Sequence, residues 1–596
     1  MRRLAFASLT TSLLVSSCGL FKVPGAGTTT YRNPLTITAP DGTRVETCAD
    51  PSVIRSKVPG DPHWYLYCTT DPLNAQDKDG SGNLRFRLIP VSKSTDLVNW
   101  TYVGDAFAQK PGWVKDDAGL WAPEIVYQNG KYYLYYAASD TKAGGSAIGV
   151  ATSDSPAGPW TDSGGPVVEP QAPPGGDPNA RRWVFDPEVL TDQSGQRWIY
   201  YGSYFGGLSV RKLSADGLKT DPATQVEVAL DNRYEGALVT YREGYYYLMA
   251  SATNCCNGPL TGYSVFAGRS TSPTGPFVDR EGVSLLSPRV GGTPVLSLNG
   301  NRWVGPGHHD VFTDAGGQDW TIYHAIDRYD PDLGPGLTKR PALLDPIDWV
   351  NGWPTVRGGS WASDEPMPGP AAQPGEKSAY RVKVRPDDQV GERLSEYGDA
   401  FAGDTLGPAW SWVRPPAGGF GVAGGVFTFD TQAADLYEDQ NSASVLTRAA
   451  PSGDYAVQVK LRTTVPAEGC CQNYVQGGLL IYGDDDRYLK LAVVSIWNTR
   501  QIEWAKETPL GTPAVPRYGN TVLGPPGDTT WLRIVRRGGA GGEETYTAYS
   551  SLDGLTWVRG GTWTHALGRA KIGLVSQGGA GFQSEFSDLR VYRLRN

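Results

Sequence analysis

Residues 131–140, KYYLYYAASD, followed by residues 148–164, IGVATSDSPAGPWTDSG, contain the pattern that decides the fold. A glycine or asparagine turn precedes an aromatic strand, and a second strand then ends in Ser, Asp or Pro before an aromatic residue. Four more copies begin with HWYLYCTT (63–70), RWIYYGSYFGG (197–207), GYYYLMASATNCC (244–256) and DWTIYHAID (319–327). Five copies, each long enough for a four-stranded sheet, predict a five-bladed β-propeller. A β-sandwich with long hairpins is the alternative, but it does not explain five similar units.

The pattern changes after the fifth copy. Residues 361–395 are rich in Pro, Gly and charge, which is typical of a linker. From residue 396 to residue 596, runs such as DYAVQVKLRTT (454–464) and TYTAYSSLDGLTWVRG (545–560) alternate apolar with polar residues. Such alternation predicts a two-sheet β-sandwich. We therefore expect an all-β chain, with the propeller in residues 31–360 and the sandwich in residues 396–596.

The N-terminus has the order of an export signal. Arg2 and Arg3 precede an apolar stretch from residue 4 to residue 15, and small residues lead to Cys18. This ending resembles a bacterial lipobox, in which the cysteine becomes the lipidated first residue of the mature protein. We expect a lipoprotein signal peptide in residues 1–18 and a tether in residues 19–30. The apolar stretch is too short to span a bilayer, so a lipid at Cys18 is the predicted membrane attachment of this exported protein, and secretion without lipid is the alternative.

Charge and cysteine content limit the partners and the cofactors. The formal net charge of -8 comes without any basic block, which excludes nucleic acid as a partner. Six cysteines remain besides Cys18, an even number for a compartment that permits disulfides. Cys48 and Cys68 could form a bridge, and the adjacent pairs at 255–256 and 470–471 match no standard zinc motif. We expect a structural use of these cysteines in a monomeric protein.

Three acidic residues occur early in three different copies: Asp50 in ETCADPSVIR, Asp186 in WVFDPEVL and Glu235 in RYEGALVTY. Hydrolysis of a glycosidic bond needs one carboxylic acid to protonate the leaving oxygen and one carboxylate on the other face of the sugar. Taken singly, an Asp-Pro pair is more often a turn than a catalyst. The first strand of each propeller blade lines the central channel, so acids at equivalent blade positions are expected to converge there. The convergence predicts a hydrolase site.

Several strings together resemble glycoside hydrolase family 43, and its arabinanase branch in particular, from Tyr31 to about Arg357. They are CADPSVIR, LWAPEIVYQNGKYYLYYAASD, FDPEVLTDQSGQRWIYYGSYFGGLSV, YEGALVTYREGYYYLMASATNCCNG and NRWVGPGHHDVF. The resemblance implies an inverting enzyme acting on α-1,5-linked arabinofuranose chains. It makes Asp50 the general base, Glu235 the general acid, and Asp186 the residue that orients the acid and raises its pKa. The sandwich is similar to the concanavalin-like jelly rolls at the carboxy terminus of many such enzymes.

The same resemblance implies further site residues. Trp121 and Phe205 match positions at which the family places aromatic rings against the sugar, with core packing as the alternative. His308 in GPGHHDVF matches a histidine that faces a metal, often calcium, in the propeller channel, although His309 departs from the usual Asn. Calcium prefers six to eight oxygen ligands, so water would have to complete its shell. Cys255-Cys256 also has a family counterpart, whereas Glu124 is read as a structural acid.

Two alternatives stay open. Within the family, an exo-acting α-L-arabinofuranosidase or a β-xylosidase would differ in loops whose sequence is not informative. In another class, a non-catalytic glycan-binding lipoprotein would capture polysaccharide at the cell surface, but the presence of all three acids argues against it. In the sandwich, Trp410, Trp412 and Trp497 are candidates either for packing or for sugar binding.

Overall fold

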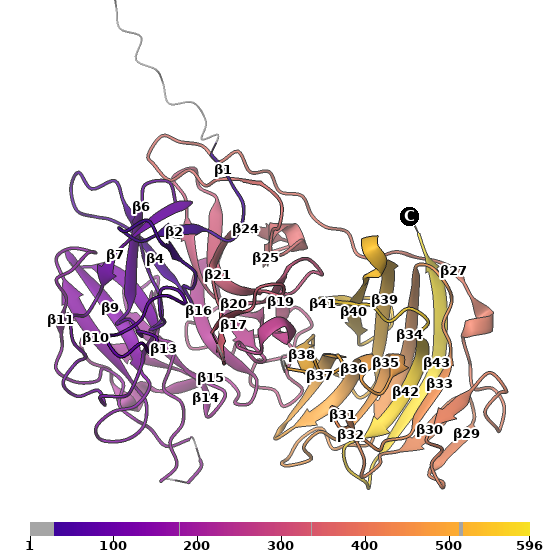
Figure 1. Cartoon of the computed structure of the whole chain (residues 1–596). Helices are drawn as coiled ribbons and strands as arrows, with labels where there is room; N and C mark the ends of the chain where they lie inside the picture. The colour runs from indigo at the N-terminus through magenta and orange to yellow at the C-terminus, as the bar shows by residue number, and fades with distance from the viewer. Residues whose placement is uncertain (1–28, 174, 178, 335, 512–515, 596) are drawn as a thin grey trace, which may run out of the picture.

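The computed structural model describes residues 29–173, 175–177, 179–334, 336–511 and 516–595, whose regular secondary structure is almost entirely β-strand (Figure 1). The predicted signal peptide, Cys18 and nearly all of the predicted tether lie outside these residues. Five short 3-10 turns accompany the strands, at Pro222–Thr224 (η1), Gly258–Leu260 (η2), Arg357–Gly359 (η3), Ser395–Tyr397 (η4) and Ala540–Gly542 (η5). None of the helical segments described is long and apolar enough to cross a lipid bilayer.

Five blades, antiparallel except for one parallel strand pair in blade 1, form the predicted propeller. Blade 1 contains β2 (Thr36–Thr38), β3 (Arg44–Val45), β4 (Ser52–Arg55), β5 (Trp64–Tyr67), β6 (Pro90–Ser94) and β7 (Asn99–Asp105). Blade 2 contains β8 (Leu120–Gln128), β9 (Lys131–Ala138), β10 (Ala147–Ser153) and β11 (Thr161–Asp162); blade 3 contains β12 (Glu188–Thr191), β13 (Arg197–Ser203), β14 (Gly207–Leu213) and β15 (Val226–Ala229). Blade 4 contains β16 (Tyr234–Arg242), β17 (Tyr245–Ala252), β18 (Ser264–Ser270) and β19 (Thr293–Leu296); blade 5 contains β20 (Trp303–Thr313), β21 (Asp319–Asp327), β24 (Ala342–Val350) and β25 (Trp353–Val356).

The aromatic run of each copy forms the second strand of its blade, which is buried on both faces. In β9, Tyr132, Leu134 and Tyr136 belong to a buried cluster shared with blade 1. The alternate residues Tyr133 and Tyr135 belong to a second cluster, shared with blade 3. Because successive side chains of a strand point to opposite faces, a strand between two neighbouring blades must be apolar throughout. This packing explains why the repeats read as continuous aromatic runs.

The N-terminal segment connects the last blade to the first. The amide of Leu35 donates to the carbonyl of Ala342 in β24 of blade 5, at 2.9 Å. The following strand β2 pairs in parallel with β7 of blade 1. Before it, β1 (Thr30–Tyr31) pairs with β26 (Met367–Pro368), which follows blade 5. The N-terminal segment therefore closes the ring of blades by contacting both blade 5 and blade 1, and the segment after blade 5 pairs with it.

The C-terminal residues form the two-sheet sandwich expected from their alternation. One sheet contains β27 (Val390–Arg393), β29 (Phe420–Ala423), β30 (Val426–Asp430), β34 (Tyr455–Thr463), β39 (Thr530–Gly538), β40 (Glu544–Ser551), β41 (Val558–His565) and β43 (Gln583–Leu594). The other contains β28 (Ser411–Val413), β33 (Val445–Ala449), β35 (Gln476–Asp484), β36 (Arg487–Ile496), β37 (Thr499–Glu507), β38 (Tyr518–Val522) and β42 (Lys571–Gln577). Two small hairpins complete the strands: β22 (Asp332–Gly334) with β23 (Leu337–Thr338), and β31 (Leu436–Tyr437) with β32 (Gln440–Asn441).

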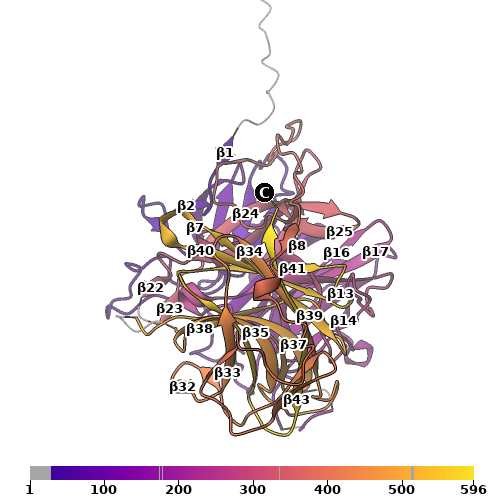
Figure 2. The same cartoon turned by 90° about the vertical axis from the view of Figure 1, so that its right-hand side faces the viewer.

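The sandwich lies directly against the propeller, and Figure 2 shows it in front of the blades. The buried guanidinium of Arg233, just before β16 of blade 4, donates to the Gln501 side chain at 2.8 Å and to the Leu523 carbonyl at 2.9 Å. The amide of Arg500 donates to the carbonyl of Pro288 at 2.7 Å. Strand β37 and its neighbours therefore support the blade that carries Glu235.

Three disulfides join the six cysteines as Cys48–Cys68, Cys255–Cys256 and Cys470–Cys471. The first links the residues before β4 to the end of β5 within blade 1. The second lies in the loop after β17 and faces the cavity described below. The third lies in the sandwich, before β35. Trp410, one of the sandwich tryptophans, is buried, whereas Trp497 is 47% exposed.

Candidate active site

A residue with a left-handed backbone lies within or just before the inner strand of each blade. These residues are Asp50 (φ 49), Ala122 (φ 43), Asp186 (φ 56), Gly236 (φ 57) and His308 (φ 41). Residues other than glycine rarely adopt this conformation unless the surrounding structure imposes it. In three blades the pairing of the inner strand shifts register beside this position, and such bulges redirect side chains. The five positions form a ring at one end of the channel.

A cavity of about 930 Å³ lies over this ring, and Asp50, Asp186 and Glu235 all line it. The structure therefore brings the three predicted acids together. Asp50 and Asp186 occupy equivalent ring positions, whereas Glu235 precedes the ring residue Gly236 by one position. The cavity wall also contains aromatic and aliphatic side chains: Phe86, Leu88, Trp121, Trp183, Phe185 and Leu337.

The two predicted aromatic contacts differ in position. Trp121 lines the cavity and is 38% exposed. Phe205 is 54% exposed and is not among the lining residues; its ring packs edge-on against Trp183, with 4.6 Å between ring centroids. Trp183 itself lines the cavity. Phe205 therefore lies at the rim, one ring away from the cavity wall.

Asp50 is held in a cationic environment. The hydroxyl of Thr69 donates to its Oδ2 at 2.6 Å. The Nη1 of Arg340 and the Nδ1 of His308 lie 3.4 Å and 3.3 Å from its Oδ1. Burial alone raises the pKa of Asp50, but the charge of Arg340, with His308 and His324, brings that pKa well below its usual range. Asp50 is therefore ionised at neutral pH.

The pKa values of Glu235 and Asp186 are shifted upward, opposite to that of Asp50. Burial raises the pKa of Glu235, against hydrogen bonds from the hydroxyls of Tyr263 to Oε1 at 2.7 Å and of Ser203 to Oε2 at 2.8 Å. Burial, followed by the charges of Glu235 and Asp50, raises the pKa of Asp186 well above its usual range. The amide of Gly236 donates to Asp186 at 3.0 Å. Because two neighbouring buried carboxylates repel each other, this pair holds a proton to a higher pH than two isolated carboxyl groups would.

A second set of three acids lies deeper in the channel and does not line the cavity: Glu124, Glu188 and Asp310. Each comes two residues after a ring position, so it faces the same channel. The hydroxyl of Ser52 contacts Glu124 at 3.0 Å and Asp310 at 3.3 Å. Burial is the first cause that raises the pKa of each, to about 8 for Glu188 and about 6 for Asp310. The reading of Glu124 as a structural acid fits this position.

His308 faces the channel as expected, but its surroundings do not suit calcium. Its Nδ1 faces Asp50, whose Oδ1 is also close to the positively charged Arg340. Calcium takes six to eight oxygen ligands, and one imidazole supplies none. Among the residues that the structure describes, no group of three or more His, Cys, Asp or Glu side chains is arranged to hold a metal ion. The calcium site stays a prediction, and no step below depends on it.

Sequence reasoning missed several residues of the site, among them Thr69, Ser203, Tyr263 and Arg340. Thr69 and Ser203 had a usable signal, because each comes at the end of the aromatic second strand of its copy. Tyr263 and Arg340 lie outside the strands, in segments where the repeat gives no register. Arg340 also contacts Asp71, with Nη2 and Oδ2 separated by 3.5 Å.

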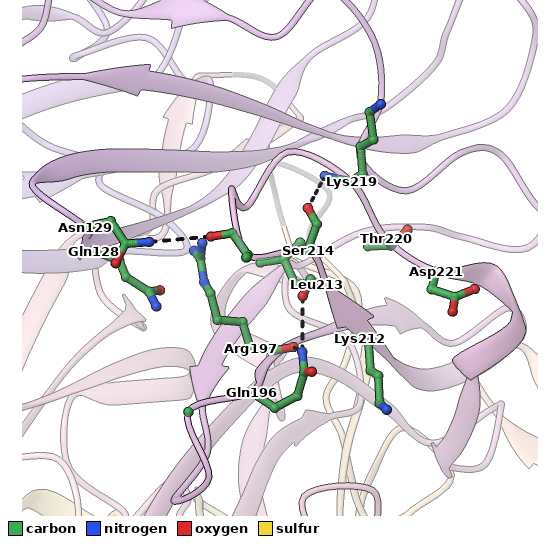
Figure 3. A pocket seen from close by; sticks show the side chains of 12 residues that line it. Gln128, Asn129, Gln196, Arg197, Lys212, Leu213, Ser214, Lys219, Thr220 and Asp221 are labelled. Atoms are coloured by element: carbon green, nitrogen blue, oxygen red, sulfur yellow. Dashed lines mark hydrogen bonds between the residues drawn. The ribbon is translucent and has the colours of Figure 1, made fainter.

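A second pocket, of about 510 Å³, lies at the other end of blades 2 and 3 (Figure 3). It includes the turn at Gln128 and Asn129, and the Nε2 of Gln196 donates across it to the carbonyl of Leu213 at 3.1 Å. Among the described residues that line it, Asp221 is the single acid, and its carboxylate accepts from the amide of Ala223. This pocket offers no pair of carboxylates, so the ring cavity is the candidate active site.

Comparisons with known proteins match the propeller region of the chain. A family model described as glycosyl hydrolases family 43 matches residues 45–354. The extracellular endo-α-(1→5)-L-arabinanase 1 of Bacillus subtilis (strain 168) is 34% identical over 285 residues, 46% of this chain and 82% of that protein. The extracellular exo-α-(1→5)-L-arabinofuranosidase ArbA of Cellvibrio japonicus (strain Ueda107) is 33% identical over 321 residues, 49% of this chain and 82% of that protein. A solved Cellvibrio cellulosa α-L-arabinanase complexed with arabinohexaose is 29% identical, covers 52% of this chain and 95% of its own, and has a TM-score of 0.43.

Proposed function

Since the chain belongs to family 43 of the glycosyl hydrolases, we propose that it hydrolyses the α-1,5-linked L-arabinofuranose chains of arabinan with inversion at the anomeric carbon. The observation that carries the proposal is the pair Asp50 and Glu235. The two carboxyl groups open to one cavity, and their surroundings move their pKa values in opposite directions. An ionised base facing a protonated acid is the arrangement that glycosidic hydrolysis requires.

Asp50 is the general base in this proposal. It takes a proton from a water molecule as the water attacks the anomeric carbon. Arg340 keeps the carboxylate ionised. The hydroxyl of Thr69 binds Oδ2, and Oδ1 faces Arg340 and His308. The base is thus oriented before substrate arrives.

Glu235 is the general acid and donates its proton to the leaving glycosidic oxygen. Asp186 is the neighbouring acid whose repulsion helps to keep that proton on the pair, and the Gly236 amide holds it in place. When the bond has broken, the proton taken by Asp50 and the proton lost by Glu235 are exchanged with solvent. The site then returns to its starting state.

The substrate-binding roles follow from position. We propose that Trp121 in the cavity wall packs against a sugar ring near the bond that is cleaved, and that Phe205 at the rim contacts a unit farther along the chain. The aromatic faces suit the apolar C–H faces of sugars. An exo-acting enzyme is a second candidate because one of the similar proteins is an exo-α-(1→5)-L-arabinofuranosidase. Oligomers of several lengths released from linear arabinan support endo action, whereas a single short product supports exo action.

We also propose that the protein is exported and lipid-anchored through Cys18. The similar proteins of Bacillus subtilis and Cellvibrio japonicus are described as extracellular, which supports export. Incorporation of a labelled fatty acid into the wild-type chain, and its loss in Cys18→Ala, tests the anchor. A wild-type chain that is exported without label contradicts it.

The direct test of the function is Glu235→Gln assayed on linear, debranched arabinan, with Glu124→Gln as the matched control in the deeper layer. General acid catalysis contributes about 10²- to 10⁴-fold, so Glu235→Gln should lose activity on that scale. Glu124→Gln should keep it to within about threefold. No hydrolysis by the wild type, or full activity of Glu235→Gln, contradicts the proposal.

A further inference from the structure

Two exposed aromatic side chains lie together at one end of the sandwich. Trp497, in the two-residue turn between β36 and β37, is 47% exposed, and Tyr474, just before β35, is 58% exposed. Both have left-handed backbones, with φ of 51 for Trp497 and 66 for Tyr474. Large side chains rarely adopt this conformation, and strained residues of this kind concentrate at functional sites. Neither ring is needed to fill the sandwich core.

Hydrogen bonds hold the two segments side by side. The amide of Trp497 donates to the side-chain oxygen of Asn473 at 2.6 Å. The amide of Tyr474 donates to the carbonyl of Ser495 at 2.7 Å, and the amide of Ser495 donates to the carbonyl of Val475 at 3.0 Å. The aromatic pair therefore rests on a fixed backbone.

This end of the sandwich is bonded to the rim of the propeller cavity. Asn498, next to Trp497, donates to Asp231 at 2.8 Å and accepts from the side chain of Asn232 at 3.0 Å. The amide of Asn232 donates in turn to the carbonyl of Tyr204 at 2.9 Å.

The residue after Tyr204 is Phe205, whose ring packs against Trp183 in the cavity wall. Exposed aromatic residues thus occur on both sides of the junction between the propeller and the sandwich. They are Trp121, Trp183, Phe205, Trp497 and Tyr474.

We propose that Trp497 and Tyr474 form a distal subsite on the sandwich that binds the arabinan chain beyond the catalytic cavity. The inference rests on the proposed function, because the bound polymer is the one that the cavity cleaves. Aromatic rings attract the polarised C–H groups of a sugar face. A long chain that is bound in the cavity has a high effective concentration at the second subsite, so contact at both places raises its affinity. A short oligosaccharide reaches only the cavity and does not gain this affinity.

The test compares polymer with short substrate in Trp497→Asn and Tyr474→Asn. Asn is chosen because it tolerates a left-handed backbone, so the fold is kept, as an unchanged Tm should show. We expect KM for linear arabinan to rise about 3- to 10-fold and kcat/KM for a short arabino-oligosaccharide to stay within about twofold. Trp497→Tyr keeps an aromatic ring at this position, so its KM for linear arabinan should stay close to that of the wild type.

Phe420→Ala is the matched control. Phe420 lies in β29, is 42% exposed, and is far from the propeller (Figure 1), so its loss should leave both substrates unaffected. An unchanged polymer KM in both Asn variants, or an equal loss on the two substrates, overturns the subsite. If the wild type hydrolyses no arabinan at all, the proposed function fails, which is a different result from an active wild type whose Asn variants match it.

Discussion

Two sets of three carboxyl groups lie one above the other in the propeller channel, and only the upper set lines the cavity, together with Asp71 and Asp117. Asp50, Asp186 and Glu235 line the cavity, with Arg340 beside one of them. The deeper acids Glu124, Glu188 and Asp310 are absent from the cavity lining. Ser52 and backbone amides supply their hydrogen bonds.

The difference between the layers lies in how charge is distributed. In the upper layer Arg340 lowers the pKa of Asp50 while burial raises that of Glu235, so the cavity contains one carboxyl group suited to act as a base and one suited to act as an acid. In the deeper layer the pKa of every member is raised, first by burial. No neighbouring cation lowers the pKa of any of the three, and none of them lines the cavity, so the deeper layer contains no counterpart of Asp50. A cluster of carboxyl groups therefore indicates a catalytic site only when a cation lies beside one of them and the cluster opens to a cavity that substrate can enter.

The largest expected effect comes from exchanging one aspartate in each layer. Asp50→Asn removes the base and should lower kcat on linear arabinan by about 10²- to 10⁴-fold. Asp310→Asn, the same chemical change one layer deeper, should leave kcat within about threefold, whatever it does to stability. Steady-state assays on the two purified variants measure kcat. Equal losses of kcat in both variants contradict the claim that only the upper layer is catalytic.

The next effect concerns the cation. Arg340→Gln removes the charge that lowers the pKa of Asp50, so that pKa should rise. Because the base must be ionised, the acidic limb of the profile of kcat/KM against pH should move to higher pH by about 1 to 3 units. An acidic limb that stays in place shows that Arg340 does not control the base.

A smaller shift is expected from Tyr263→Phe. The tyrosine hydroxyl donates to Glu235 and lowers its pKa, so its removal should raise the pKa of the acid further. Because the acid must be protonated, the basic limb of the same profile should move to higher pH, by less than about 1 unit, while the acidic limb stays. Movement of the acidic limb alone contradicts the roles given to the two acids.

The smallest effect on activity, with a distinct effect on stability, is expected for Glu188→Gln. The folded-state pKa of Glu188, about 8, lies above its value in an unfolded chain. Its contribution to the free energy of unfolding is thus fully present at low pH and is lost as the pH rises through about 8. Between about pH 5 and pH 8 the free energy of unfolding of the wild type should fall by up to ~1.4 kcal/mol per pH unit, and that of the variant should fall less. Urea unfolding at several pH values measures both, and identical slopes count against a protonated Glu188.

Much of the fold could be predicted because the repeat encodes it directly. The five aromatic runs are the second strands of five blades, and their doubly buried position leaves a continuous apolar pattern in the sequence. The recurrence of Asp50 and Asp186 at blade starts predicted their convergence for the same reason.

The rest of the site depends on features without a sequence period. Asp186 and Glu188 are two residues apart on one strand face, so alternation places both in the channel and cannot tell which one reaches the cavity. Glu235 stands one position before the left-handed residue of its blade, where a bulge, not the repeat, sets the direction of its side chain. Arg340 lies in an irregular loop, and only folding brings it beside Asp50, 290 positions away.

The most direct test of the central claim is to identify the anomer first released when the wild type cleaves linear α-1,5-arabinan, followed by proton NMR before mutarotation. With Asp50 activating water and Glu235 protonating the leaving oxygen, water attacks the face opposite the bond that breaks. The newly formed reducing end should therefore appear first as the β-anomer. First release of the α-anomer indicates retention and a covalent intermediate, and it contradicts the roles given to Asp50 and Glu235.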